Sequence, residues 1–328
     1  MMIANNNPAF GYGPINFKTN NIPSINNFCA LGSGFGNVDQ DFELGRKRKL
    51  NQLPELIPKR RKIRYEMKLV CGSSYFPKYN PEKPLGEDAH FVSHDAQTVG
   101  VADGVGSWAR KGIDAGEYAR GLMNHAKQAA TNMSAVGAAA VDAGKVLREA
   151  YVNNFGIQGS STACILSLDK ERGTLHAVNV GDSGFMVFRD AKCMLKSPTQ
   201  QRRFNCPFQL GNHVGSDRPQ VALEFVVEEL APGDIIVLGT DGLLDNMFAS
   251  EIEEVLVAFN KVSGGRDIDC AEVASTIATM ALYNSLDKDN ISPFQMEAQK
   301  AGLEHAGGKI DDITVVVAHV VESTTSSD

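Results

Sequence analysis

Eight short runs of apolar and β-branched residues, several of them joined by short turns, constrain this chain more than any other feature of its sequence. Links such as DKERG and NVGDSG are too short for a crossover helix, so they favour antiparallel neighbours. The strand-like runs are Ala89–Ser93, Thr98–Asp103, Ser161–Leu168, Leu175–Val180, Phe185–Arg189, Leu223–Leu230, Asp234–Gly239 and Ile313–Val321. The pattern predicts antiparallel sheets.

Longer helical stretches separate these blocks of strands. Asp114 is placed to cap one helix, and Ser292 followed by Pro293 is typical of the start of another. Further helices are expected over Val141–Phe155, Ser250–Asn260 and Ala271–Asn284. Because strands come in blocks with helices between them, the sequence predicts an α+β sandwich of sheets and helices rather than a regular βαβ array.

The first 62 residues differ from the rest of the chain. Their first forty are rich in Asn, Gly and Pro without periodicity, and the 62 residues carry a net charge of +5. We therefore expect a disordered basic tail over 1–62, a globular domain over 63–322 and a flexible C-terminus over 323–328. The basic clusters GRKRKL and PKRRKIRY can form a nuclear-import address, a charged tether or part of an organelle transit peptide. They favour the nucleus or the cytoplasm.

Charge and composition exclude several classes of partner. The whole chain carries −7, so the residues after 62 carry −12, which is unfavourable for binding nucleic acid. No run approaches the eighteen consecutive apolar residues of a membrane span. The six cysteines are scattered without a Cys-x-x-Cys pair, which indicates reduced thiols rather than a zinc site. We expect neither a nucleic-acid nor a membrane partner.

Acidic residues lie at the boundaries of five of the expected strands, mostly beside glycine. A single such residue is commonly a turn carboxylate that bonds its own backbone. If the five segments converge, however, their carboxylates form a set of oxygen ligands suited to Mg²⁺ or Mn²⁺ rather than to zinc. The segments are GEDAHF with Glu87 and Asp88, VADGVG with Asp103, NVGDSG with Asp182, GTDGLLDN with Asp241 and Asp245, and GGKIDDITVVV with Asp311 and Asp312.

These motifs, in this order and spacing, resemble those of the metal-dependent type 2C protein serine/threonine phosphatases. The resemblance covers roughly Lys68 to Val321 and rests on EDAH, ADGVG, GSSTACI, NVGDSGF, GTDGLLDN and DDITVVV. FNCPFQL, SPF and GGK are similar to the branch with mitochondrial, plastid and other plant members, which makes a plastid or mitochondrion the alternative location. The resemblance implies a four-layer αββα sandwich of two antiparallel sheets flanked by helices.

The resemblance also implies roles for individual residues. Asp103 would bridge two metal ions, Mn²⁺ or Mg²⁺, and Gly104 would bind through its carbonyl. Asp241 and Asp311 would complete the direct ligands of one ion. The other ion would be held through water by Glu87, with Asp88 close by, and Asp182 would join Asp241 at a third, weaker metal site.

The resemblance implies hydrolysis of phosphoserine and phosphothreonine in proteins by a monomeric enzyme, without a covalent intermediate. A water held between two ions loses a proton near neutral pH and can attack phosphorus in line. Two positions depart from the family. Val105 stands where many members have the histidine that protonates the leaving group, and Lys83 stands where many have a phosphate-holding arginine. The alternative is therefore a catalytically weak or dead relative that binds phosphoproteins.

Overall fold

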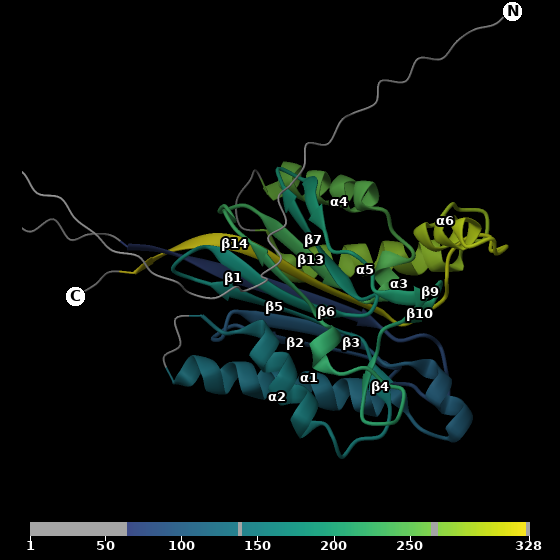
Figure 1. Cartoon of the computed structure of the whole chain (residues 1–328). Coiled ribbons are helices and arrows are strands. Elements are labelled where there is room, and N and C mark those ends of the chain that lie inside the picture. Colours follow the sequence, from purple (N-terminus) through teal and green to yellow (C-terminus); the bar gives the residue numbers. More distant parts are fainter. Residues whose placement is uncertain (1–63, 137–139, 264–267, 326–328) are drawn as a thin grey trace, which may run out of the picture. The chain divides into compact units, whose positions relative to one another are not determined.

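Two antiparallel sheets, packed face to face, form the centre of the fold (Figure 1). The computed structural model describes residues 64–136, 140–263 and 268–325, so the expected tail over 1–62 and most of its basic clusters lie outside them. The first sheet has the order β1-β14-β13-β7-β8 and the second the order β12-β6-β5-β3-β2. Every neighbouring pair in both sheets is antiparallel, as the short turns predict.

The strands of the two sheets are short except for one pair. The first sheet consists of β1 (Arg64–Phe76), β14 (Ile313–Thr325), β13 (Ile235–Gly239), β7 (Gly184–Arg189) and β8 (Lys192–Lys196). The second consists of β12 (Leu223–Val227), β6 (Thr174–Val180), β5 (Ala163–Asp169), β3 (Thr98–Asp103) and β2 (Asp88–Ser93). Two small sheets add β10 (Cys206–Pro207) with β9 (Gln201–Arg203), and β11 (Leu210–Gly211) with β4 (Ser160–Ser161).

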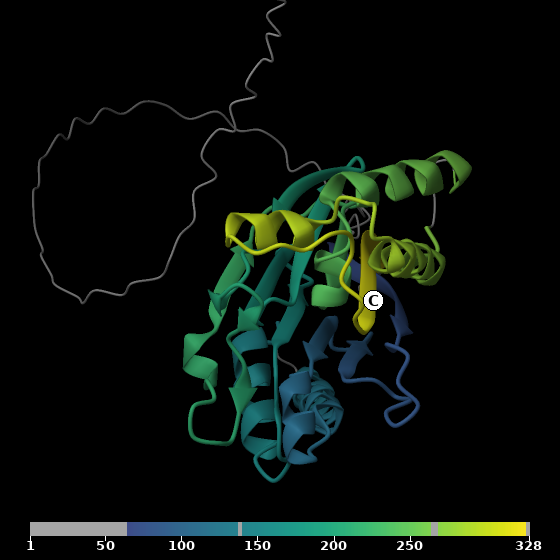
Figure 2. The same ribbon diagram turned by 90° about the vertical axis from the view of Figure 1, so that its right-hand side faces the viewer.

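Helices cover the outer face of each sheet, which gives the expected α+β four-layer αββα sandwich (Figures 1 and 2). α1 (Ala115–Ala135) and α2 (Ala143–Asn153) pack on the second sheet. α4 (Ala249–Ser263) and α5 (Cys270–Leu286) pack on the first. The shorter elements are the 3₁₀ helices η1 (Gly106–Lys111) and η2 (Pro219–Val221), α3 (Asp241–Leu244) and α6 (Pro293–Lys300).

Three apolar cores follow from these four layers. The core between the sheets is built from alternating residues of facing strands, such as Leu166 of β5, Phe185 of β7 and Val316 of β14, each essentially without exposed surface. The other two cores lie between each sheet and its helices. Strands in the middle of both sheets are therefore buried on both faces, which explains why every residue of β5 and β13 is buried and why β13 is a continuous apolar run.

The predicted caps are confirmed. The Asp114 side chain accepts a hydrogen bond from the backbone N–H of Gly116 at 3.0 Å, and the Ser292 hydroxyl accepts one from Gln295 at 3.0 Å, with Pro293 in the first turn. Both caps satisfy an N–H group that a helix start leaves without an intrahelical partner. No helix among the described residues is long and apolar enough to cross a bilayer.

Several elements differ from the sequence expectation, and the strands β8 to β11 were not predicted. β1, which we did not predict, pairs with the whole of β14, from Arg64↔Thr325 to Phe76↔Ile313. β14 therefore continues to Thr325, beyond the boundary at 322 expected from the sequence. The expected strand Ser161–Leu168 is divided at Thr162, whose hydroxyl turns instead to the backbone N–H of Asp103 at 3.0 Å.

We predict that β1 tolerates no side chain at Gly72. A Cβ there would lie 2.2 Å from the backbone N of Ala271 and 2.4 Å from the backbone C of Cys270, so α5 would have to move. Gly72→Ala should therefore lower the free energy of unfolding by about 2 kcal/mol, as overpacking does. Gly156→Ala is the control, because a Cβ at Gly156 meets nothing within 4 Å. Equal urea-unfolding midpoints for the two variants would contradict the close approach of β1 to α5.

Candidate metal centre

Carboxylates from separate segments meet where strands of the two sheets end. Asp103 is the last residue of β3, Asp182 lies in the turn between β6 and β7, and Asp241 follows β13 as the first residue of α3. One carboxylate oxygen from each lies within 4.8 Å of the others. The convergence expected from the sequence is therefore present for these three residues.

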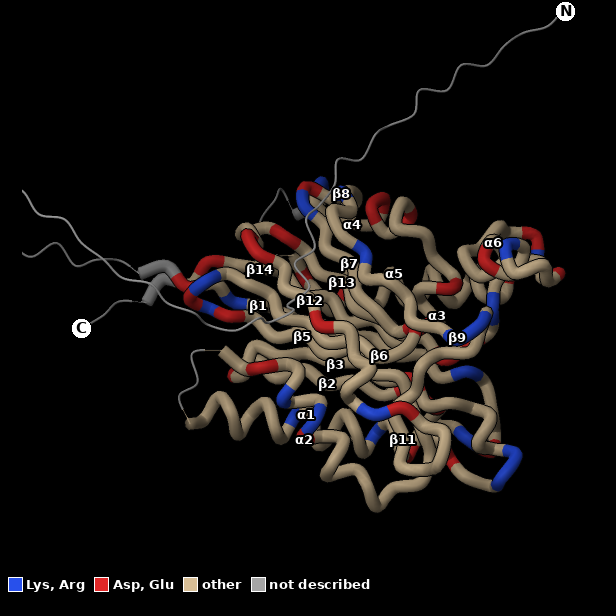
Figure 3. The backbone as a smooth tube through the Cα atoms, in the orientation of Figure 1, with Lys and Arg blue, Asp and Glu red and all other residues tan. Residues whose placement is uncertain are grey.

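A hollow of about 730 Å³ opens beside this cluster. Its lining includes four of the predicted ligands, namely Glu87, Asp103, Asp241 and Asp311, together with Gly104. The hollow is also lined by four cationic side chains that are far apart in the sequence: Lys78, Arg110, Arg203 and Lys309. The hollow thus combines oxygen ligands with positive side chains that suit an anionic substrate. Figure 3 shows basic positions at and near β9, the strand that contributes Arg203 to this lining.

Asp88 is buried behind the hollow rather than lining it. It lies opposite Asp103 in the register of β2 and β3. Its Oδ2 accepts hydrogen bonds from the hydroxyls of Thr240 and Thr314, each at 2.7 Å, whereas its Oδ1 has no donor among the described residues. Burial first, and then the charge of Asp312, raise the pKa of Asp88 well above its usual value. The two threonine hydroxyls act against this rise.

The carboxylates of the cluster raise one another's pKa. Burial and the neighbouring charge of Asp241 raise the pKa of Asp103 well above its ordinary value, and the same two causes bring the pKa of Asp182 to about 7. Burial also raises the pKa of Asp241 and brings that of Asp245 to about 7, although Lys309 lowers both. Positive charge supplied to these oxygens would therefore bind in competition with protons.

Lys309 is the cation that meets the cluster in this structure. Its Nζ contacts Asp241, and it lies 2.9 Å from Asp245 Oδ2 and 3.1 Å from Asp311 Oδ2. Burial acts to lower the pKa of Lys309, but the three carboxylates outweigh it and the pKa stands well above its ordinary value. For Asp311, burial acts to raise the pKa, but Lys309 and Lys78 outweigh it and the pKa is lowered.

Gly104 lets two backbones approach beside the cluster. Its N–H donates to the Glu87 carbonyl at 3.0 Å, and a Cβ at this position would lie 2.6 Å from the carbonyl oxygen of Ala115. Any side chain would therefore push β3 away from the start of α1. The glycine fixes the backbone immediately after Asp103, which is where the sequence predicts a carbonyl ligand.

Asp312 anchors the loop before β2. Its Oδ1 accepts from the backbone N–H of Lys78 at 2.8 Å, and its Oδ2 accepts from the backbone N–H of Glu87 at 3.1 Å. Glu87 is thereby held at the hollow, where Lys83 pairs with it at 2.7 Å. Lys83 is not among the residues that line the hollow, so its expected contact with phosphate stays a prediction.

The donor set fits hard divalent cations. Oδ1 of Asp88, Asp182 and Asp241 is buried in each case without a hydrogen-bond donor among the described residues. Unsatisfied buried carboxylate oxygens are costly unless a cation meets them. The ligand atoms within reach are oxygens, which Mg²⁺ and Mn²⁺ prefer. The residues present therefore suit the metals that the sequence predicts.

Two lysines of the site were not identified from the sequence. Lys309 is the last residue of the GGK motif, two residues before Asp311, and this proximity in the sequence could have indicated that it belongs to the site. Lys78 gave no such signal, because nothing in its surroundings indicates that its Nζ comes within 3.1 Å of Asp311 Oδ1. That contact depends on the loop between β1 and β2.

Comparisons with known proteins agree with this geometry. The family model described as stage II sporulation protein E (SpoIIE) matches residues 94–321. The chain is 44% identical over 257 residues to "Probable protein phosphatase 2C 55" of Arabidopsis thaliana, a match that covers 78% of this chain and 53% of that protein. It is 38% identical over 249 residues to "Protein phosphatase PTC7 homolog fig" of Drosophila willistoni, covering 72% and 77% respectively.

Solved structures show the same architecture. The photosystem II phosphatase PBCP superposes with a TM-score of 0.66 at 31% identity, covering 76% of this chain and 98% of that one. The catalytic domain of PstP, solved in complex with two manganese ions, has a TM-score of 0.53 at 19% identity over 78% and 99% of the two chains, and shares the fold. The present chain spans about half the length of the Arabidopsis relative named above. By sequence and by fold, it belongs to the protein phosphatase 2C family.

Proposed function

We propose that this protein is a metal-dependent phosphatase that hydrolyses phosphoserine and phosphothreonine in proteins. The observation that carries the proposal is the convergence of Asp103, Asp182 and Asp241, with oxygens within 4.8 Å of one another, beside a hollow that cations also line. The family membership supports the reaction class. The unpartnered oxygens support a need for added cations.

Residues at or beside strand ends of both sheets would hold the metal ions. Asp103, the Gly104 carbonyl and Glu87 come from the β2–β3 side, and Asp241 and Asp311 come from the β13 and β14 side. Asp182, which lies within reach of Asp241, suits a third and weaker site. A bound pair of Mn²⁺ or Mg²⁺ ions would activate a water for in-line attack on phosphorus and neutralise charge on the phosphoryl oxygens.

The chain's own cations would orient the phosphate. Arg110 and Arg203 line the hollow from two separate segments, and a planar guanidinium can bind two phosphoryl oxygens at once. Lys78 lines it too, while its Nζ pairs with Asp311 at 3.1 Å. Lys309 has a different part, because its Nζ is engaged by Asp241, Asp245 and Asp311. It would neutralise part of the acidic cluster before metal arrives and withdraw from the carboxylates as metal binds.

We expect hydrolysis of a phosphopeptide to require Mn²⁺ or Mg²⁺ and to stop in EDTA, because carboxylate sites hold these ions loosely. Asp103→Asn removes charge from the centre of the cluster, so kcat should fall by about a hundredfold or more. Asp289→Asn is the matched control, since Asp289 is exposed and lines none of the hollows described here. Activity that persists after metal stripping would contradict the mechanism, and absence of any activity would favour the phosphoprotein-binding alternative.

Lys309→Gln should destabilise the metal-free protein more than the metal-bound protein. Without the ammonium group, Asp241 and Asp245 lose their cation and Asp311 keeps only Lys78, so the metal-free protein should lose about 3 kcal/mol of stability. Added Mn²⁺ should then raise the melting temperature more in the variant than in the wild type. Lys300→Gln is the control, because its pair with Glu297 is exposed. Equal melting temperatures in EDTA for the two variants would contradict this role of Lys309.

Val105→His tests the missing proton donor. Val105 lines the hollow, and no histidine is among the lining residues. A histidine there could protonate the departing alkoxide, which a phosphoserine peptide needs and an aryl phosphate scarcely needs. We expect the substitution to raise kcat on the phosphoserine peptide more than on the aryl phosphate. An equal effect on both substrates would mean that this step does not limit turnover.

A further inference from the structure

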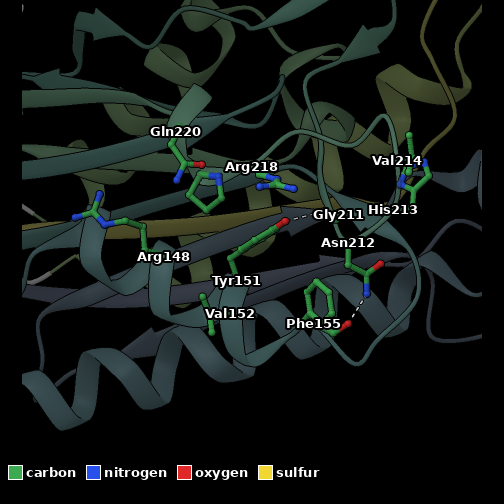
Figure 4. A pocket seen from close by; sticks show the side chains of 11 residues that line it. Arg148, Tyr151, Val152, Phe155, Gly211, Asn212, His213, Val214, Arg218 and Gln220 are labelled. Carbon is green, nitrogen blue, oxygen red and sulfur yellow. Dashed lines mark hydrogen bonds between the residues drawn. The ribbon is translucent and has the colours of Figure 1, made fainter.

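A second hollow, of about 500 Å³, lies between the end of α2 and the segment 211–220 (Figure 4). We call it the distal hollow. Two hydrogen bonds fix its walls: Tyr151 Oη donates to the Gly211 carbonyl at 2.9 Å, and Asn212 Nδ2 donates to the Ile157 carbonyl at 2.9 Å. The start of the segment 211–220 is therefore tied to α2 and to the loop that follows it, and this side of the distal hollow is preformed.

Apolar side chains in the distal hollow are exposed to solvent. Val152 of α2 is 68% exposed, Phe155 is 66% exposed and Val214 is completely exposed. All three line the same hollow. Covering them would remove apolar surface from water, which favours binding of an apolar residue from a partner.

The charged residues that line the distal hollow are cations, in a globular part that carries −12 overall. Arg148 and Arg218 line it, and no carboxylate does so. Arg148 meets Glu224 at 3.5 Å, and both side chains are about half exposed or more. The Arg218 guanidinium makes no ion pair with any described residue and is exposed. The distal hollow therefore combines an apolar wall with an uncompensated positive charge.

A smaller hollow connects the distal hollow to the metal centre. It has a volume of about 210 Å³ and shares His213 with the distal hollow, and it shares Ser107 and Gln209 with the hollow beside the carboxylates. Its charged lining residue is Lys111, which lies over the Trp108 ring at 4.5 Å. Because they share lining residues, we call the three hollows together the groove; beyond the acidic cluster, its charged lining residues are cations.

The groove fits an extended segment of the substrate protein. We propose that the distal hollow binds a part of the phosphoprotein that carries a carboxylate next to an apolar residue, some residues away from the phosphorylated one. The carboxylate would pair with Arg218, and the apolar side chain would pack on Val152 and Phe155. The chain's own residues 1–62 do not complement the site, because their net charge is +5. The proposal rests on the proposed function and names the class of substrate within it.

The kinetic test uses the full chain with Mn²⁺. Phosphoserine peptides carrying a Glu-Leu pair at increasing distances from the phosphoserine are compared with peptides carrying Gln-Ser at the same places. We expect the Glu-Leu peptide of suitable spacing to have a KM about tenfold lower. Arg218→Glu and Phe155→Ala should remove that difference without changing kcat or hydrolysis of an aryl phosphate. A preference that survives in Arg218→Glu would overturn the proposal.

Lys127→Glu is the matched control, because Lys127 is exposed on α1 and lines neither the distal hollow nor the connecting one. A binding measurement keeps the test independent of activity. Fluorescence anisotropy of a labelled, unphosphorylated Glu-Leu peptide should show binding to the wild type and to Asp103→Asn, and about tenfold weaker binding to Arg218→Glu. Equal binding to all variants would overturn the proposal. Loss of hydrolysis with retained, Arg218-dependent binding would count against the proposed function alone.

Discussion

The rest of this structure depends on one constraint: several carboxylates are buried together at one end of the two packed sheets. Asp88, Asp182 and Asp241 are buried, and burial together with mutual repulsion raises the pKa of each. Such an arrangement is unfavourable by itself, so it persists only because the surrounding structure holds it. The inter-sheet core, with Phe185, Leu166 and Val316 fully buried, supplies that support.

The local partners of these carboxylates fall into two kinds. The hydroxyls of Thr240 and Thr314 both bond Asp88 Oδ2, which holds that side chain behind the hollow. Lys309, by contrast, has a long flexible side chain that ends in a compact charge. Its partners are Asp241 in α3, Asp245 at the C-cap of α3 and Asp311 just before β14. The first kind of contact sets geometry, and the second adjusts charge.

Charge is separated along the groove. The acidic cluster lies at the metal centre, whereas Arg110, Lys111 and Arg218 lie along the path away from it. A phosphoprotein carries negative charge both on phosphate and on acidic side chains, so cations at both ends of the groove suit it: Arg110 beside the reacting phosphate and Arg218 beside an acidic segment. Strand ends, loops and the short helices η1 and α3 carry these groups, and the sheets position them.

A structural feature could be predicted from the sequence when the residues that determine it lie in one short stretch of the chain. Most strands and helices, the caps at Asp114 and Ser292, and the acidic strand ends are properties of short stretches, and the structure contains them. β1 was missed because its stretch CGSSYF contains small and polar residues without a clean alternation, and it is held by pairing with β14 over its whole length. Lys78 reaches Asp311 for a similarly non-local reason.

The sequence by itself determined the type of fold, through short turns that require antiparallel neighbours, and the oxygen chemistry of the site, through acidic residues at strand ends. Only the tertiary structure decided which carboxylates meet, which of them turn toward threonine hydroxyls, and where the cations lie. The physical reason is that residues far apart in the chain become neighbours only when the two sheets pack and their strand ends coincide. Distances between side chains of different strands follow from that packing and from no property of either strand alone.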